Sequence, residues 1–450
     1  MDVFTRSTLI SAVTTTMMSL VAFAQQGTPT GGYQLLRTIT IPTGLAGNDI
    51  SWVDSATARY YLADRGNSPS VGPSIDVIDT ENNQFLTSIP LPSPGNGVLA
   101  IPRAHELWVG MNNSTVAVIS TDTNQITHTI STGGTARADE LAWDPDDKLI
   151  VIANDRDTPP FVSFISQETY SVVKRFTYDG SAGPKSTGGI EQALWDGAAG
   201  KFYIAIPSTA ANPTGEIDEL DPVQFTVTRV IPSTCKGPSG LVLISNQRLA
   251  SACGDIIDLA SGKVITTVSG VSGDEIWYNS GDQRIYYSGG QAVGVVDANT
   301  NQLLTSLPVG VPAAAPAPAQ STHSLAADAV NNKVFVSVSA SGTGTGSGVG
   351  IQVWRNGASL TITPNPIPVT VGGFLGSAII SWTAPNAQLI EIHIGSPSGQ
   401  LFTVEGNHGS ISTGLWVSEG LTFYLQDVTN NKPLTAANTL ATATAHLRPM

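Results

Sequence analysis

The stretch SIDVIDTENNQFLTSIPLP at residues 74–92 decides the fold, because the same pattern returns along the chain. Apolar and polar residues alternate on each side of a turn that is rich in Asp, Asn and Thr, which is the pattern of an antiparallel hairpin. Further copies lie at residues 115–132, 161–177, 215–232, 254–270 and 292–310. This recurrence indicates a repeat architecture.

A second element precedes each hairpin. It opens with a short polar pair, continues as an apolar strand and turns into a strand that is often rich in aromatic residues, as in DELAWDPDDKLIVIAN at 139–154 and EQALWDGAAGKFYIAIP at 191–207. These elements open at residues 48, 96, 139, 191, 239, 274 and 323, so the period averages about 46 residues. Four strands per unit at this period predict an all-β fold, with a seven-bladed β-propeller over 33–356.

The two ends of the repeat region complement each other. YQLLRTITIP at 33–42 resembles the fourth strand of a unit but has no unit before it, and VGIQVWRN at 349–356 resembles a third strand with no fourth strand after it. We therefore expect the N-terminal strand to complete the last unit, which removes an open sheet edge. The composition agrees, since 45 Gly, 28 Pro and only 12% charged residues are typical of short strands joined by turns.

The hairpin copies VIDTENNQFLTSI at 77–89 and VVDANTNQLLTSLPVG at 295–310 resemble the YVTN/YncE-type propeller repeat. The resemblance covers residues 33–356 and implies a seven-bladed propeller, often exported, in a family with diverse roles. Lactonases and other hydrolases share this general architecture, but a fold alone does not carry an activity.

After residue 356 the pattern changes to short alternating segments separated by Pro-Asn and Gly turns, such as SAIISWTAP and GLTFYLQDV. About ninety residues with six or seven short strands predict an immunoglobulin- or fibronectin-III-like β-sandwich over 358–450. Modules of this kind usually serve as spacers or adhesive elements.

The N-terminus indicates export. Arg6 precedes an apolar run over 8–22, and Ala22-Phe23-Ala24 forms an A-x-A cleavage pattern before Gln25, so residues 1–24 are predicted to be a signal peptide. An N-terminal membrane anchor is the alternative, but the run is short and rich in Thr and Ser. We expect a protein secreted to the extracellular space or the periplasm, with no membrane span after signal removal.

Cys235 and Cys253 are the two cysteines of the chain, and an even count in an exported protein favours a disulfide. Cys235 precedes the predicted strand over 241–245, and Cys253 ends the return strand over 248–252. These points lie close together in an antiparallel hairpin, as a disulfide requires. Two separate buried thiols are the alternative.

The net charge of −14 and the pI of about 4.7 limit the partners. Nucleic-acid binding needs a basic stripe, and the chain has no cluster of Lys and Arg. We therefore expect no nucleic-acid partner. Cations, small polar molecules or a protein partner are favoured instead.

The polar pairs that open the units carry the candidate site, because the first strand of each propeller blade lines the central channel. These pairs are Asn48-Asp49, Asn96-Gly97, Asp139-Glu140, Glu191-Gln192, Ser239-Gly240, Asp274-Glu275 and His323-Ser324. We expect them to surround one acidic funnel. Clustered carboxylates repel one another unless a cation neutralises them, and Ca²⁺ or another divalent cation suits oxygen ligands.

The site residues are predicted in three groups. Glu140, Glu191 and Glu275 are the candidate metal ligands, and Asp139 and His323 are the candidate acid/base groups. Other polar residues of the ring are candidates for ligand binding, namely Asp49, Asn96, Gln192, Asp274 and Ser324. The alternative is that the polar pairs only satisfy backbone groups and hold channel water.

Three functions follow from this ring. The leading hypothesis is a secreted binding or scaffold protein that holds a cation or a small polar ligand. The second is a metal-assisted hydrolase of lactonase type, in which the ion would polarise an ester carbonyl. The third is a surface or matrix protein that binds other proteins.

Two further features have competing interpretations. The polar loop ANDRDTPPFVS at 153–163 could rim a pocket with Asp155, Arg156 and Asp157, or these charges could simply be solvated. Tryptophans recur near the ends of first strands, where packing between units explains them better than sugar stacking; they are Trp52, Trp143, Trp195 and Trp277.

Overall fold

A computed structural model describes residues 33–45, 47–66, 71–244, 247–310, 319–340, 349–384, 387–435 and 438–449. The predicted signal peptide at 1–24 lies outside these residues. The described chain is all-β, and its only helical pieces are two three-residue 3-10 turns, η1 (Pro102–Ala104) and η2 (Thr429–Asn431). No helix among the described residues is long and apolar enough to cross a membrane.

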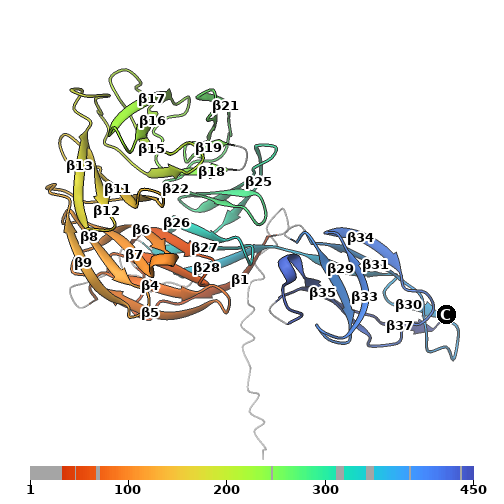
Figure 1. The fold of residues 1–450 in the computed structure, drawn as a ribbon. Helices are drawn as coiled ribbons and strands as arrows, with labels where there is room; N and C mark the ends of the chain where they lie inside the picture. The colour runs from red at the N-terminus through yellow and green to blue at the C-terminus, as the bar shows by residue number, and fades with distance from the viewer. Residues whose placement is uncertain are drawn as a thin grey trace, which may run out of the picture.

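Seven four-stranded antiparallel sheets lie in the described part of residues 33–356 (Figure 1). Six of them take four consecutive strands in sequence order. The first three are β2 (Asn48–Asp54), β3 (Arg59–Asp64), β4 (Ser74–Asp79) and β5 (Gln84–Pro90); β6 (Gly95–Ile101), β7 (Glu106–Met111), β8 (Thr115–Ser120) and β9 (Gln125–Ser131); and β10 (Leu141–Asp144), β11 (Leu149–Asn154), β12 (Phe161–Ser166) and β13 (Ser171–Thr177).

The next three sheets repeat this order. They are β14 (Ala193–Asp196), β15 (Lys201–Ile206), β16 (Glu216–Asp221) and β17 (Thr226–Pro232); β18 (Leu241–Ile244), β19 (Arg248–Ser251), β20 (Asp255–Asp258) and β21 (Lys263–Thr267); and β22 (Glu275–Asn279), β23 (Arg284–Gly289), β24 (Ala292–Asp297) and β25 (Gln302–Pro308).

The seventh sheet joins the two ends of this region. Its order is β1 (Tyr33–Ile39), β28 (Gly350–Asn356), β27 (Lys333–Ala340) and β26 (Gln320–Asp328). β1 pairs antiparallel with β28, from Tyr33 opposite Asn356 to Ile39 opposite Ile351. The predicted pairing of the N-terminal strand with the last strand of the repeat region is confirmed.

Each first strand contacts the first strand of the next sheet, in the order β2, β6, β10, β14, β18, β22, β26. The last of them, β26, contacts β2. Apolar clusters fill the spaces between neighbouring sheets; Phe164 from β12, for example, shares one cluster with Phe202 and Leu220 from the next sheet. The inner strands bury side chains on both faces, so the start of each first strand has a fixed place beside its neighbours.

The chain after residue 356 forms a separate group of strands, drawn in blue in Figure 1. These strands are β29 (Ser359–Thr363), β30 (Ile367–Val369), β31 (Ile379–Thr383), β32 (Ile390–Ile394), β33 (Gln400–Glu405), β34 (His408–Ser412), β35 (Thr422–Asp427), β36 (Thr439–Thr444) and β37 (Leu447–Pro449). One sheet has the order β29-β31-β34, a second has the order β33-β32-β35-β36, and β30 pairs with β37. One apolar core joins the first two sheets, through Trp382 from one and Ile392 and Phe423 from the other.

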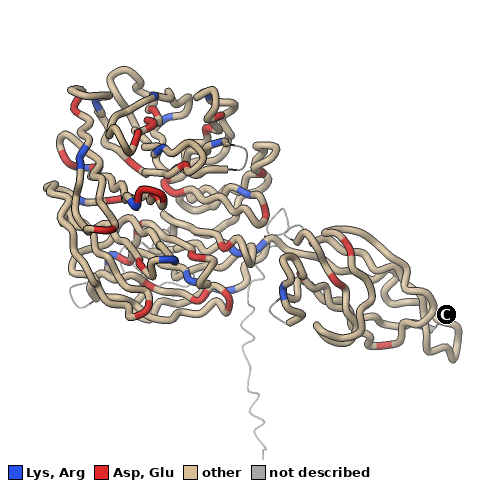
Figure 2. The backbone as a smooth tube through the Cα atoms, viewed as in Figure 1, with Lys and Arg blue, Asp and Glu red and all other residues tan. Residues whose placement is uncertain are grey.

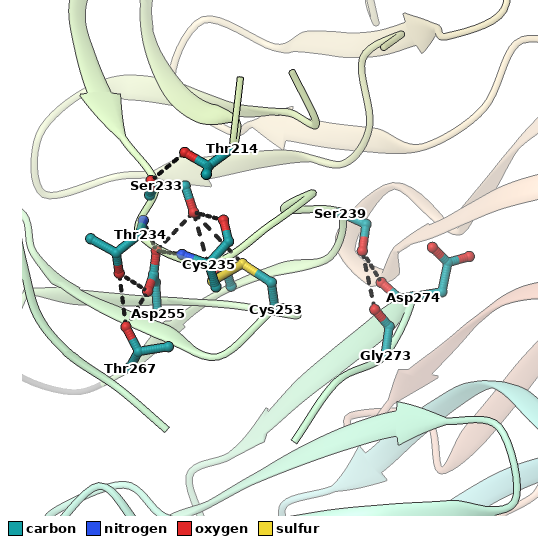
Figure 3. Close-up of a disulfide and its surroundings, with 11 residues drawn as sticks. Thr214, Ser233, Thr234, Cys235, Ser239, Cys253, Asp255, Thr267, Gly273 and Asp274 are labelled. Atoms are coloured by element: carbon teal, nitrogen blue, oxygen red, sulfur yellow. Dashed lines mark hydrogen bonds between the residues drawn. A yellow bond between two sulfur atoms is a disulfide. The ribbon is translucent and has the colours of Figure 1, made fainter. Parts of the chain in front are cut away.

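The predicted disulfide between Cys235 and Cys253 is present, with Cα atoms 5.7 Å apart (Figure 3). Beside it, the buried carboxylate of Asp255 accepts hydrogen bonds from Ser233 Oγ at 2.8 Å and Thr234 Oγ1 at 2.6 Å. A few residues later, Ser239 Oγ donates to the carbonyl oxygen of Asp274 at 3.1 Å. The disulfide and Asp255 therefore fix the segment that leads into β18 and contacts the start of β22.

Replacing both cysteines, as in C235S/C253S, should lower the free energy of unfolding by about 3 kcal/mol, because a crosslink over a loop of this size restricts the unfolded chain by about that amount. Urea unfolding of the mature protein measures the loss. Dithiothreitol should lower the unfolding midpoint of the unmodified protein and leave that of the double variant unchanged. Equal stability of the two proteins would show that the disulfide is dispensable.

Candidate functional site

The starts of the first strands meet at one opening, and the structure brings several predicted residues together there. The Nε2 atom of His323 lies 2.7 Å from Asp49 Oδ1 and 3.0 Å from Asp274 Oδ2. Asp49 belongs to the opening pair of the first unit and His323 to that of the seventh. Their side chains can meet because β2 and β26, the first strands of these two units, contact each other.

Arg137 lies at the centre of this opening and was not expected from the repeat pattern. Its guanidinium group is 2.5 Å from Asp139 Oδ2, 2.8 Å from Asp155 Oδ2 and 3.5 Å from Asp49 Oδ2. All three carboxylates are at least 95% buried. Buried charges of one sign need a partner, so Arg137 is what allows these carboxylates to lie together.

Two further arginines complete the opening. Arg65 donates to the carboxylate of Asp49, and also to Asn96 Oδ1 at 2.8 Å. Arg156 Nε is 3.3 Å from Asp155 Oδ2, and its side chain is 70% exposed. Of the two interpretations of the 153–163 loop, the structure favours the pocket rim for Arg156, whereas Asp155 is buried and holds Arg137.

These groups enclose a solvent-open pocket of about 350 Å³, which we call the mouth pocket; it is lined by Arg65, Asn112, Arg137 and Arg156. The sequence pattern predicted an acidic funnel. In the structure the carboxylates Asp49, Asp139 and Asp155 form ion pairs with arginines, and these arginines, not the carboxylates, line the mouth pocket. A signal existed for Arg65 and Arg156, since Arg65 directly follows the second strand β3 and Arg156 lies two residues after the second strand β11. The ends of second strands lie beside the starts of first strands in an antiparallel hairpin.

His323 is held as a cation. Burial lowers its pKa, but the hydrogen bonds to Asp274 and Asp49 outweigh burial and raise the pKa to about 10. In turn, burial raises the pKa of Asp274, and the hydrogen bond from His323 outweighs it, so the pKa of Asp274 lies below its ordinary value. His323 was predicted as an acid/base group; as a cation it has no free proton acceptor at neutral pH, so the geometry does not suit the base half of that role.

Asp139 is the second predicted acid/base group, and its Oδ2 atom forms an ion pair with Arg137. Burial and the charge of Asp49 raise its pKa, although Arg137 opposes them. Its other oxygen, Oδ1, is buried without a hydrogen-bond partner among the described residues. Asp139 thus stabilises the charge cluster and does not face the mouth pocket.

A second, smaller cavity of about 20 Å³ lies among the first strands, and we call it the inner chamber. Glu140 and Glu275 line it and are 5% and 4% exposed. Glu140 Oε2 and Glu275 Oε1 have no hydrogen-bond partner among the described residues. Trp52 and Trp277, which also line the chamber, meet edge to face with ring centroids 5.2 Å apart.

The two chamber carboxyl groups perturb each other. Burial, followed by the charge of Glu275, raises the pKa of Glu140 well above its ordinary value. Burial, followed by the charge of Asp274, raises the pKa of Glu275 to about 8. Within the described part of the chain no arginine lines the chamber, whereas three line the mouth pocket.

Other predicted ligand-binding residues hold neighbouring strands together. The side-chain oxygen of Gln192 accepts a hydrogen bond from the backbone N–H of Leu241. Ser324 Oγ accepts from the backbone N–H of Ser51 at 2.8 Å. These contacts occupy the two side chains in linking adjacent first strands, although Gln192 also lines the inner chamber.

The predicted metal ligands do not converge on one ion. Among the described residues, Cys235, Cys253 and Asp255 are the only three His, Cys, Asp or Glu residues whose ligand atoms all lie within 4.8 Å of one another, and the cysteines are joined as a disulfide. Glu191 is half-buried at the opening, apart from the chamber lining. Glu140, Glu191 and Glu275 therefore do not bring three ligand atoms within 4.8 Å of one another, and their binding of Ca²⁺, which takes six to eight oxygen ligands, stays a prediction.

Compared with known proteins, the chain matches no protein-family model and no curated protein sequence.

The raised pKa of His323 predicts a pH-dependent contribution to stability. A histidine whose folded pKa exceeds its unfolded value stabilises fully below about pH 6.5, and this contribution is lost as the pH rises through about 10. The stability difference between the wild type and H323Q should thus be largest below pH 6.5 and shrink between pH 7 and 10. Urea unfolding across this range measures it, with H408Q, an exposed histidine, as the control. A difference that is constant with pH would contradict the paired imidazolium.

Proposed function

We propose that residues 33–356 form a seven-bladed β-propeller of the YVTN/YncE type, closed by the N-terminal strand, and that residues 358–450 form an immunoglobulin-like β-sandwich. The proposal is supported by seven four-stranded sheets in the described residues, by the cyclic contacts of their first strands and by the pairing of β1 with β28. The disulfide supports a secreted protein, since such bonds persist in oxidising compartments.

We further propose that the chain binds a small carboxylic acid that also carries an amino or hydroxyl group. The mouth pocket is the observation that carries this proposal. Arginine is the side chain best suited to a carboxylate, because its planar group donates two parallel hydrogen bonds. The volume of about 350 Å³ suits a small molecule.

The guanidinium of Arg156 remains available for such a ligand, because its side chain is 70% exposed. Arg137 is engaged by three carboxylates, and Arg65 Nε is buried. On the acidic side, Glu191 lies near enough to Asp274 and Arg156 for their charges to shift its pKa. A ligand with one anionic group and one donor group would use both sides.

A hydrolase of lactonase type has less support. That mechanism needs a metal held by several ligands and a group that accepts a proton. The described carboxylates offer no set of three ligand atoms within 4.8 Å, and His323 already donates to two carboxylates. Binding without turnover fits these observations better.

A thermal-shift screen of the mature protein against small amino and hydroxy carboxylic acids tests the mouth pocket. We expect a saturable rise in the unfolding midpoint, since a ligand present at a hundred times its Kd adds about 2.7 kcal/mol. R156Q should weaken binding about tenfold or more, because a charge-assisted hydrogen bond is lost.

The matched control is R103Q, since Arg103 is exposed and lies outside the mouth pocket. It should bind like the wild type. If no acid binds, or if R156Q binds as tightly as R103Q, the mouth pocket is not the ligand site.

The inner chamber supports a second candidate function, the binding of a single cation by Glu140 and Glu275. Two buried carboxylate oxygens without partners face a cavity with room for about one water-sized particle. A buried carboxylate needs either a proton or a positive charge. A cation there would supply that charge, and it would lie beside Trp52 and Trp277, which also line the chamber.

Thermal unfolding after chelation, with Ca²⁺, Mg²⁺, Mn²⁺ or Zn²⁺ restored singly, tests the chamber. One metal should raise the midpoint in a saturable way, and E140Q/E275Q should abolish the rise because the charge is removed while the shape is kept. E191Q should retain it, since Glu191 does not line the chamber. No response to any metal would mean that the two carboxyl groups share protons instead.

A further inference from the structure

Five large apolar side chains stand exposed on two loops of the C-terminal strands. Residues 370–376 carry Val371, Phe374 and Leu375, which are 83%, 82% and 49% exposed. Residues 413–418 carry Leu415 and Trp416, which are 71% and 36% exposed. We call these two segments the tip loops.

The tip loops form one surface. The backbone N–H of Gly376 donates to the carbonyl oxygen of Val417 at 2.8 Å, and the N–H of Val417 donates back at 3.0 Å. Val417 itself is fully buried in the core of the C-terminal strands. The exposed side chains therefore flank a fixed bridge between the two loops.

Packing beneath the loops holds them in place. The ring of Trp416 contacts the rings of Phe402 and Phe423, with centroids 5.7 Å and 6.1 Å away. Phe423 is fully buried. One face of Trp416 is thus anchored in the domain, while Phe374 and Leu415 extend from it into solvent.

The position of the surface leaves the mouth pocket free. The first tip loop follows β30, which lies with β37 at the end of the molecule farthest from the seven sheets (Figure 1). A contact made by the tip loops therefore does not cover the site formed by the first strands.

Charge is nearly absent from this end. The segments TVGGFLGSA at 370–378 and ISTGLWVS at 411–418 contain no charged residue, and residues 358–450 contain six Asp, Glu, Lys and Arg in all. Figure 2 shows how sparse charges are here compared with the seven sheets. The adjacent Glu419 is already paired, with His446 at 2.9 Å. Contact with an apolar phase would therefore bury no charge of the tip loops.

The size of the surface is compatible with a shallow contact. With these exposed fractions, the five side chains present roughly 600 Å² of apolar area, which is at the upper end of the patches that single proteins expose and at the lower end of what each partner buries in a stable protein interface. Protruding side chains enter a lipid surface without needing a complementary shape, and Trp and Phe are suited to the lipid–water boundary.

We propose that the tip loops insert into a neutral, zwitterionic lipid surface and anchor the protein there. The net charge of −14 opposes adsorption to anionic lipids, so the attraction has to come from apolar burial. Because the contact is made by five side chains, it is reversible and independent of ligand binding in the mouth pocket.

Co-sedimentation of the mature protein with phosphatidylcholine vesicles tests the proposal. The wild type should bind, with a blue shift of tryptophan fluorescence, and F374S/L415S should bind at least tenfold more weakly. V223S is the matched control, because Val223 is 73% exposed but lies in the hairpin between β16 and β17. It should bind as the wild type does. Unchanged thermal midpoints would show that all three proteins fold.

Four outcomes would overturn the proposal. The first is no binding to phosphatidylcholine vesicles, and the second is binding that F374S/L415S leaves intact. The third is a concentration-dependent dimer in sedimentation velocity that F374S/L415S abolishes, since the surface would then be covered by a second copy. Stronger binding after phosphatidylglycerol is added would also contradict it, because the attraction would then be electrostatic.

Discussion

The pairing of β1 with β28 is the constraint on which the rest of the structure depends. Without β1, the seventh sheet would end at β28 with an unpaired edge. With it, the last unit is complete and its first strand, β26, lies against β2. Asp49 and His323 stand 274 residues apart in the chain, and their hydrogen bond exists because the two ends of the repeat region meet. The site thus depends on the pairing of β1 with β28 and the contact of β26 with β2 as well as on any one motif.

The repeat register predicted most of the strands, because four-stranded units leave a hydrophobic pattern that period and turn chemistry make visible. EQALWDGAAGKFYIAIP, for example, was predicted as two strands and forms β14 and β15. The same register placed Asp49, Asp274 and His323 in the opening pairs of three units, and the structure brings their side chains together. Residues at the opening-pair position of the repeat could therefore be found from the sequence.

Residues outside that position could not be found in the same way. Arg137 lies two residues before an opening pair, in a connection that no other unit repeats. Its role depends on three carboxylates contributed by three different segments, at Asp49, Asp139 and Asp155. Side-chain pairing of this kind follows from distances in space, which a repeat pattern does not carry. For the same reason, the repeat pattern did not predict that the ring divides into a mouth pocket and an inner chamber.

The mouth pocket and the inner chamber differ in how their buried carboxylates are neutralised. Taking ionised groups out of water costs free energy, and the cost is offset when an opposite charge and hydrogen bonds surround them. In the mouth, Arg137 and His323 provide that charge from within the chain, so the carboxylates Asp49 and Asp274 are held without any ligand. The arginine donors left over are then free for an anionic molecule from outside.

Among the described residues, no cationic side chain lines the inner chamber. Glu140 and Glu275 each keep an unpaired, buried oxygen, and burial, followed by the charges of neighbouring carboxylates, raises their pKa values. The two carboxyl groups need a positive charge or protons from solution, whereas the mouth needs neither. The same ring of strands therefore presents donors to an anion at its opening and acceptors to a cation within it.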